Sequence, residues 1–220
     1  MKLALFDLDN TLLDGDSDYC WAQYLIERGI LERAEYEKKN DWFFHHYKQG
    51  TLDIHEYLGF QLAPVAGRPR AEIDAWHRDF MEAKIRPIVH AGTRPLLASH
   101  DGALRAIVTA TNRFITDPIA RELGIEHLIA CEVEEMPDGR LTGRAVGTPS
   151  FREGKIARLH EWLATLGLRF GDFAETWFYS DSHNDLPLLE LVSKPVAVDP
   201  DSTLERHAGE RGWPILRLRA

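Results

Sequence analysis

The chain has 220 residues, of which 44% are hydrophobic and 28% are charged, a composition typical of a folded protein rather than a disordered one. Its net charge of −9 lacks the excess of basic residues that nucleic-acid binding needs. No apolar segment approaches the roughly 20 residues that a membrane-spanning helix requires. We therefore expect no nucleic-acid or membrane partner, and either one large domain or a core with a smaller insertion.

The N-terminus and the cysteines indicate a cytoplasmic protein. An apolar run begins at Leu3 and leaves no room for a signal peptide. The only cysteines, Cys20 and Cys131, cannot form a disulfide framework, and free thiols are typical of a reducing compartment. We expect a monomer or a homodimer, a choice that the sequence leaves open.

Residues 3–11, LALFDLDNT, begin with a short apolar run and contain two aspartates one residue apart. Such a run predicts a strand buried on both faces, and ligands of open α/β sheets bind beyond the carboxyl ends of the strands. Asp7 and Asp9 would repel each other unless a cation lay between them, and oxygen ligands favour Mg²⁺. Taken alone, the motif is equally compatible with aspartates that merely begin a loop.

Residues 15–86 differ in character from the rest of the chain. They hold twelve of the 22 aromatic residues and no convincing β-branched run, so we expect helices. Helix ends are predicted at Gly29 and Gly50, where glycine accepts the left-handed conformation, and a further helix is predicted over residues 71–84. A helical block directly after the first strand predicts a small domain covering the end of that strand, with most of its aromatics in its own core.

Beyond Pro87, strands and helices alternate. The Asp138–Gly139 pair predicts a tight hairpin, and one helix is expected to begin at Thr116 or Asp117. This alternation predicts an α/β fold with a doubly wound, mostly parallel sheet. We assign residues 1–14 and 87–220 to the core and residues 15–86 to the inserted helical domain. The predicted strands cover residues 104–109, 128–133, 176–180, 196–198 and 214–216.

Further polar residues fall where predicted strands end or helices begin. Thr109 ends one strand, Lys155 opens a helix after SFREG, and Asp181 ends the strand in FYSDSHNDLP. Asn184 and Asp185 are expected to cap the helix that follows. Each residue alone fits an ordinary strand, turn or cap position equally well. Their order on alternating strands is what points to a shared site.

In this order, DLDNT, Thr109, Lys155 and SDSHND resemble the motifs of the haloacid dehalogenase (HAD) superfamily. The helical insertion after the first motif is similar to that of the C1-capped subfamily IB, near phosphoserine phosphatase. The resemblance extends from residue 5 to residue 185. It implies a Rossmann-like core with a helical C1 cap domain, and a phosphatase whose partner is a small-molecule phosphate ester.

The resemblance also implies roles for the catalytic residues. Asp7 would be the nucleophile that forms an aspartyl-phosphate, and Asp9 would be the general acid and base. An aspartate rather than a threonine at position 9 favours hydrolysis over other HAD chemistries. Thr109, helped by the backbone amide of Ala110, would bind the phosphoryl group, and Lys155 would neutralise its charge and hold the nucleophile.

The metal site follows from the same resemblance. Mg²⁺ would be bound by the Asp7 carboxylate, the Asp9 backbone carbonyl and Asp181, with water completing the six ligands. Asp185 belongs to this metal site as the residue that orients either the lysine or a metal-bound water. Asn184 would assist in the same way or contact the substrate.

The acidic run DGDSD bears on the substrate. Asp16 occupies the position where phosphoserine phosphatases have a glutamate that pairs with the substrate's amino group, and no cap arginine clearly matches the one that binds its carboxylate. Arg28, Arg68 and Arg86 are the candidates. We hypothesise that Asp16 or Asp18 binds a cationic group of an amino-alcohol or amino-acid phosphate, such as histidinol phosphate or, with weaker support, phosphoserine. The alternative is that DGDSD is only a solvated hinge.

Three other functions use or resemble the same residues. A signalling phosphoacceptor shares the aspartate, threonine, lysine and Mg²⁺, but its acceptor lies inside a smaller domain without a helical insertion. A phosphotransferase or phosphomutase would differ only in passing the phosphoryl group to an acceptor other than water. A catalytically silent binding module is disfavoured because every expected catalytic residue is present.

Overall fold

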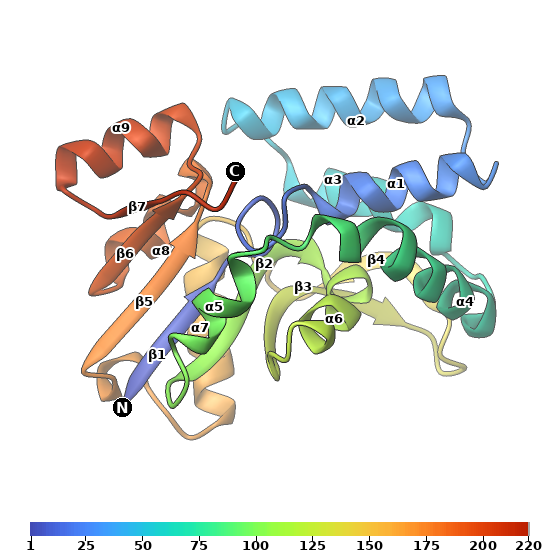
Figure 1. The fold of residues 1–220 in the computed structure, drawn as a ribbon. Helices are drawn as coiled ribbons and strands as arrows, with labels where there is room; N and C mark the ends of the chain where they lie inside the picture. Colours follow the sequence, from blue (N-terminus) through green and yellow to red (C-terminus); the bar gives the residue numbers. More distant parts are fainter. Residues whose placement is uncertain (220) are drawn as a thin grey trace.

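The computed structural model describes residues 1–219, so residue 220, the last of the predicted core segment, lies outside the described residues. Seven strands of the described chain form one sheet in the order β4-β3-β2-β1-β5-β6-β7 (Figure 1). Every neighbouring pair is parallel except β3 and β4, which form the hairpin predicted at Asp138–Gly139. The predicted α/β fold with a mostly parallel sheet is confirmed.

The strands alternate with helices along the core. The strands are β1 (Lys2–Phe6), β2 (Leu104–Asn112), β3 (His127–Glu135), β4 (Leu141–Val146), β5 (Glu175–Ser180), β6 (Lys194–Val198) and β7 (Ile215–Leu216). The core helices are α5 (Thr93–Ala98), α6 (Arg113–Glu122), α7 (Glu153–Thr165), α8 (Leu186–Leu191) and α9 (Ser202–Arg211).

The central strand β1 is buried on both faces. Leu3 and Leu5 belong to one apolar cluster, together with side chains of α7, whereas Ala4 and Phe6 belong to a second cluster that includes side chains of α6. Both faces of a parallel strand are covered when helices pack on the two sides of the sheet. Asp7 is therefore the first residue beyond the strand, at the edge of both cores.

The segment between β1 and the rest of the core is helical, as predicted. Figure 1 shows α1 and α2 beyond the end of the sheet toward which β1 runs. The helices are α1 (Ser17–Glu27), α2 (Arg33–Lys48), α3 (Ile54–Leu62) and α4 (Arg70–Phe80), with a π-helical turn (Met81–Ile85) and 3-10 turns (Ala63–Val65 and Arg86–Ile88). We call this segment the cap.

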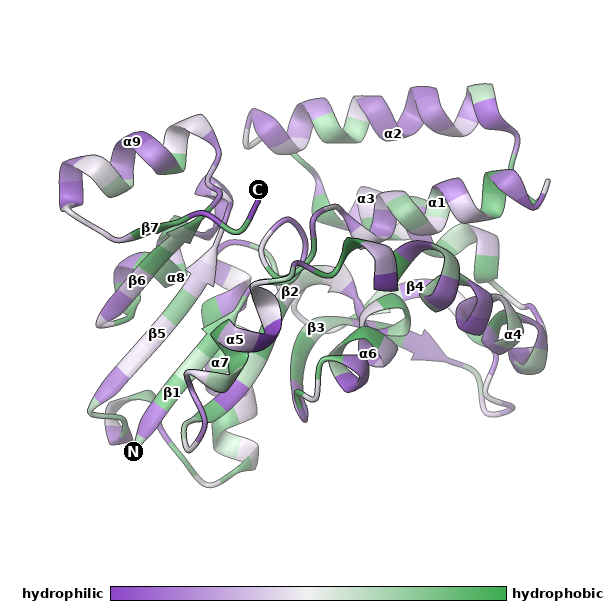
Figure 2. Ribbon diagram, in the orientation of Figure 1, coloured by the Kyte–Doolittle hydropathy of each residue, from purple (hydrophilic) through white to green (hydrophobic). Residues whose placement is uncertain are grey.

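Helices α1 and α2 are attached very differently. Trp21 of α1 is buried and packs edge-on against Phe80 of α4 and Phe114 of α6, with ring centroids 5.1 and 5.5 Å apart. Helix α2 buries only Tyr36 and Phe43 and is hydrophilic over most of its length (Figure 2). Apolar packing therefore fixes α1 firmly and α2 weakly.

The start of α6 differs from the prediction. Strand β2 continues to Asn112, whose Oδ1 accepts a hydrogen bond from the Ile115 backbone N–H at 3.2 Å and caps the helix. The helix therefore begins before Thr116 and Asp117, and Pro118 lies inside it. The prediction was wrong because asparagine is as good an N-cap as the residues chosen.

The described residues 1–219 contain no helix long and apolar enough to cross a membrane. Both cysteines are free, and burial raises the pKa of the Cys20 thiol to about 11 and that of Cys131 to about 12. Neither cysteine is a thiolate at neutral pH, so neither offers a reactive nucleophile.

The buried His77 of α4 should make the protein sensitive to acid. Its ring lies against Phe114, and burial lowers the pKa of His77 from 6.5 to about 4, so the folded chain keeps it neutral. Because the unfolded chain takes up the proton first, the free energy of unfolding should fall by roughly 2–3 kcal/mol from this group between pH 7 and about pH 4.5. Urea unfolding at both pH values should show a smaller fall for His77→Phe, and an equal fall would contradict this.

Candidate active site

One cavity of about 410 Å³ lies between the strand ends and the cap. Among the predicted catalytic and metal-binding residues, only Asp181 does not line it, although it lies beside Asp7 through a shared contact with Thr11. The structure thus brings together segments that lie far apart in the sequence. Nine predicted residues line the cavity: Asp7, Asp9, Asp16, Asp18, Thr109, Ala110, Lys155, Asn184 and Asp185.

Lys155 joins two buried carboxylates at the base of the cavity. Its Nζ donates to Asp7 Oδ1 at 2.8 Å and to Asp185 Oδ2 at 2.7 Å, and the lysine is only 2% exposed. Burial alone would lower the pKa of Lys155, but the charges of Asp185 and Asp7 raise it above its ordinary value. The lysine is therefore a permanent cation that fixes the Asp7 carboxylate at the end of β1.

The environment of Asp7 also opposes its ionisation. Burial raises the pKa of Asp7 to about 7, an effect that the charge of Lys155 opposes and the charge of Asp185 reinforces. Only one oxygen of Asp7 is bound to the lysine; Oδ2 has just a long contact of 3.4 Å with the Thr11 hydroxyl. A cation beside Asp7 would favour its ionised form and leave that oxygen available for reaction.

Asp9 is held from two sides. Its Oδ1 accepts a hydrogen bond from the Ser17 backbone N–H at 2.7 Å, and its Oδ2 accepts one from the Thr111 hydroxyl at 2.8 Å. Burial, reinforced by the charge of Asp16, raises the pKa of Asp9 to about 6. A carboxyl group with a pKa near neutrality can both donate and accept a proton, as a general acid and base must.

Sequence reasoning missed Thr111 and placed Thr109 too near the end of its strand. Strand β2 continues three residues beyond Thr109, and its register against β3 shifts between Val108 and Asn112. Irregular strand segments of this kind often aim side chains into a site. Because side chains alternate along a strand, the T-A-T spacing could have indicated that Thr109 and Thr111 share a face.

Asp181 and Asp7 share the hydroxyl of Thr11, another residue that the sequence did not single out. The Thr11 Oγ1 lies 3.2 Å from Asp181 Oδ1, and it accepts a hydrogen bond from the Asp181 backbone N–H at 3.1 Å. Burial and the charges of Asp7 and Asp185 raise the pKa of Asp181 well above its ordinary value. Carboxylates at this site therefore outnumber the single lysine.

Asp7 and Asp181 are oxygen donors of the kind that Mg²⁺ accepts. Within residues 1–219, no group of three or more His, Cys, Asp or Glu side chains is arranged to hold a metal ion. Magnesium retains several waters and needs only one or two carboxylates, which Asp7 and Asp181 offer. The excess of negative charge around them is what a divalent cation would relieve.

Asp185 and Asn184 do not cap the following helix with their side chains. Asp185 Oδ2 instead accepts hydrogen bonds from Lys155 and from the Ser180 hydroxyl, both at 2.7 Å. Ser182 caps the 3-10 turn His183–Asp185 that precedes α8, because its side chain accepts from the Asn184 backbone N–H at 3.2 Å. The contacts of Asp185 favour the lysine over a metal-bound water as the group that it orients.

The acidic run DGDSD leads into α1, which begins at Ser17, and its last two aspartates are not part of a solvated hinge. Asp16 caps the helix by accepting from the Tyr19 backbone N–H at 2.8 Å. Asp18 is 1% exposed and accepts from the Tyr57 hydroxyl at 3.0 Å and from Asn112 Nδ2 at 3.3 Å. Burial and the charges of Asp16 and Asp9 raise the pKa of Asp18 well above its ordinary value. Both carboxyl groups line the cavity, where a cationic ligand would satisfy them.

The cap supplies a wall that is aromatic and acidic. Lys155 is the only lysine or arginine that lines the cavity within the described chain. The wall therefore suits a ligand with a ring and a positive charge, and offers no cation to pair with a carboxylate. Its aromatic members are Tyr19, Phe43, Phe44, Tyr47 and Tyr57, and Asn40 and Asp41 add polar groups.

The three candidate arginines lie elsewhere. Arg28 pairs with Asp79 and the Tyr24 hydroxyl, and Arg68 pairs with Glu72 at 3.1 Å. Arg86 pairs with Glu82 and Glu122. None of the three lines the cavity, so none of these candidates supplies a carboxylate-binding arginine there.

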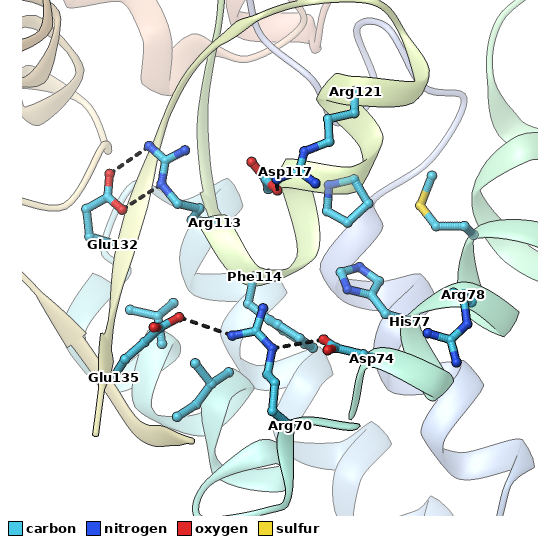
Figure 3. A pocket seen from close by; sticks show the side chains of 14 residues that line it. Arg70, Asp74, His77, Arg78, Arg113, Phe114, Asp117, Arg121, Glu132 and Glu135 are labelled. Carbon is cyan, nitrogen blue, oxygen red and sulfur yellow. Dashed lines mark hydrogen bonds and ion pairs between the residues drawn. The ribbon is translucent and has the colours of Figure 1, made fainter. Parts of the chain in front are cut away.

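A larger cavity, of about 810 Å³, lies between α4, α6 and the β3–β4 hairpin, and it contains none of the predicted residues. Figure 3 shows Arg70 reaching between Asp74 and Glu135, at 2.8 and 3.1 Å, and Arg113 facing Glu132. These charges satisfy one another, so the cavity presents few groups free to bind a ligand. The smaller cavity is the candidate active site.

Removing the lysine tests the electrostatic arrangement directly. Lys155→Met should lower kcat by at least about 100-fold and reduce the free energy of unfolding by about 3 kcal/mol at pH 7.5. The loss of stability should be smaller at pH 5.5, because burial raises the pKa of Asp7 to about 7 and its protonation removes an unpaired charge. Lys194→Met, at an exposed lysine, is the control for urea unfolding. Equal stability of the Lys155 variant and wild type at pH 7.5 would contradict the arrangement.

Comparisons with known proteins agree with this geometry. The family model of the haloacid dehalogenase-like hydrolases matches residues 4–190. A protein of Neisseria meningitidis serogroup C named histidinol-phosphatase is 47% identical over 220 residues, covering 99% of both chains.

Solved structures with similar folds include one relative of high sequence identity and one of low identity. A Bordetella pertussis protein of unknown function superposes with a TM-score of 0.92 at 48% identity, over 99% of both chains. A substrate-bound phosphoserine phosphatase shares the fold with a TM-score of 0.68 at 19% identity, covering 98% of this chain and 92% of the other. The chain therefore belongs to the haloacid dehalogenase-like hydrolases, as its sequence motifs predicted.

Proposed function

We propose that this phosphatase hydrolyses the phosphate monoester of an amino alcohol, with Mg²⁺ and through an aspartyl-phosphate at Asp7. The observation that carries the proposal is the composition of one cavity. Asp7 and Lys155 lie at its base, while its cap wall is aromatic and acidic and includes no arginine within the described residues.

In the first step, the free oxygen of Asp7 attacks the phosphorus, and the bond from phosphorus to the alcohol oxygen breaks. Asp9 donates its proton to that leaving oxygen. Lys155 and the Thr109 hydroxyl offset the negative charge of the transferring group. The cavity between core and cap would hold the ester in line with Asp7. Such positioning, together with electrostatic stabilisation, accounts for most of the catalysis of phosphoryl transfer.

In the second step, water attacks the phosphorus of the aspartyl-phosphate. Asp9, now deprotonated, accepts the proton of that water, and phosphate leaves as Asp7 is restored. Asp7, Asp181 and the Asp9 carbonyl would hold Mg²⁺, which supplies positive charge to the phosphoryl oxygens when bound. Asp185 keeps Lys155 aligned throughout.

Histidinol phosphate is the substrate that fits best. A relative named histidinol-phosphatase shares 47% of its residues with this chain. The ammonium group of histidinol phosphate would meet Asp16 or Asp18, and its imidazole would contact the aromatic wall. Phosphoserine would bring a carboxylate into an acidic cavity without a second cation, which costs binding energy.

We also propose a cytoplasmic location, which the two free cysteines support. The described chain has no membrane-spanning helix. For the oligomeric state we propose either a monomer or a homodimer. A phosphotransferase would need an alcohol in place of the attacking water, and a signalling phosphoacceptor would need a long-lived aspartyl-phosphate. No contact in the cavity favours either alternative.

The nucleophile and the metal can be tested together. Asp7→Asn should lower phosphate release from small phosphomonoesters by at least about 1,000-fold, because an amide oxygen cannot carry the phosphoryl group. Removal of Mg²⁺ with EDTA should abolish wild-type release, and added Mg²⁺ should restore it. Asp14→Asn, an exposed aspartate in the same loop, should keep its activity within twofold. More than a tenth of wild-type activity in Asp7→Asn would contradict the mechanism.

Substrate choice depends on the acidic wall. The value of kcat/KM should be at least about 100-fold higher for histidinol phosphate than for phosphoserine. Asp16→Asn or Asp18→Asn should raise KM for histidinol phosphate by roughly 10- to 100-fold, the cost of losing one charge-assisted hydrogen bond. The same variant should change KM for p-nitrophenyl phosphate, which has no amino group, by less than threefold. A preference for phosphoserine would overturn the substrate assignment.

A further inference from the structure

Arg152 connects three segments around the active site, although no sequence motif singled it out. It lies three residues before Lys155 and directly before α7. Its guanidinium donates to the Gly50 carbonyl oxygen, just beyond the end of α2, and to Asn184 Oδ1 at 3.1 Å from both Nε and Nη2. Arg152 thus links the end of α2 in the cap to two segments of the core, the start of α7 and the loop that contains Asn184.

A second set of contacts joins the same segments. Asn184 Nδ2 donates to the Tyr47 carbonyl oxygen at 3.2 Å, and the Tyr47 hydroxyl donates to Ser182 Oγ at 2.8 Å. The end of α2 therefore rests on the core through polar groups. A guanidinium suits this place because helix C-termini carry a partial negative charge.

The backbone of Arg152 is unusual for a residue with a side chain. Its φ of 52° and ψ of −124° fall in a region that favours glycine. Strained conformations persist where the surrounding structure holds them, and they occur often at functional sites. The strain is consistent with a role that belongs to the arginine side chain and that glycine could not perform.

Helix α2 forms part of the cavity wall. Phe43, Phe44 and Tyr47 of this helix line the cavity, so a movement of α2 would change the access of an ester to Asp7. Because α2 buries few apolar side chains, polar contacts at its end decide how firmly it closes. Opening would break the bonds to Arg152 and Asn184.

We infer that Arg152 is a positioning residue that fastens the end of α2 to the core and aligns the catalytic segments when the cap is closed. Asn184 and Ser182 lie between Asp181 and Asp185, and Asp185 holds Lys155. Closure of α2 would therefore order both the lysine and the carboxylate loop. The inference deepens the proposed function and rests on its Asp7 chemistry, but not on the choice of substrate.

Arg152→Gly separates this role from a structural one. Glycine suits the observed backbone, so relief of strain should offset much of the stability lost with the side-chain hydrogen bonds, and the melting temperature should fall by only a few degrees. The same variant should lower kcat for p-nitrophenyl phosphate by tenfold or more. Arg152→Lys, which keeps a charge near Gly50 but loses the two-pronged bond to Asn184, should recover part of that loss. Arg169→Gln, at an arginine far from the cavity, should match wild type.

Hydrogen exchange measured by mass spectrometry gives the structural readout. Amides of residues 47–52 should exchange faster in Arg152→Gly than in wild type, and Mg²⁺ with vanadate, a phosphate mimic, should slow them in wild type far more than in the variant. The inference is overturned if Arg152→Gly keeps kcat within twofold of wild type, or if residues 47–52 exchange identically in both proteins. A wild type that releases no phosphate from any ester would instead overturn the proposed function, and the exchange comparison without vanadate would still test the fastening.

Discussion

The ion pairs of Lys155 with Asp7 and Asp185 are the interaction on which the site depends. Two buried carboxylates can lie this close only because an ammonium group bonds to both. The lysine thereby ties the start of α7 to the end of β1 and to the loop after β5. One cation does not balance the nearby Asp9 and Asp181, so the same arrangement favours a divalent metal and a phosphoryl group whose oxygens bridge the opposite charges.

Chemistry and selection come from different parts of the chain. In the proposed mechanism, strand ends of the core supply the nucleophile and the acid–base group, and the start of α7 supplies the lysine. The cap supplies the aromatic and acidic wall that would meet the rest of the ester. Helix α2 belongs to that wall, yet it is hydrophilic and weakly packed (Figure 2). An element that must both recognise the substrate and release the product gains from being held by breakable polar contacts rather than by a large apolar core.

Local patterns were enough to predict the sheet and most of the residues that line the candidate site. The apolar run before Asp7 predicted a buried strand, and strand–helix alternation predicted that the other motifs lie near its end. The predictions that failed concerned positions where neighbouring residues compete for the same capping role, or contacts between residues far apart in the sequence. Asn112, rather than Thr116, caps α6, and the Asp185 side chain accepts a hydrogen bond from Lys155 instead of capping α8. No spacing in the sequence links Arg152 with Gly50, because only the folded cap brings them together.

The most direct test of the account is to trap the covalent intermediate. Wild-type protein is mixed with Mg²⁺ and histidinol phosphate or p-nitrophenyl phosphate and quenched in acid within milliseconds. Borohydride then reduces any aspartyl-phosphate to homoserine, which peptide mass spectrometry locates. Homoserine is expected at position 7 and at no other aspartate, with none in Asp7→Asn. Unmodified Asp7 in protein that is turning over substrate, or homoserine at Asp9, would contradict it.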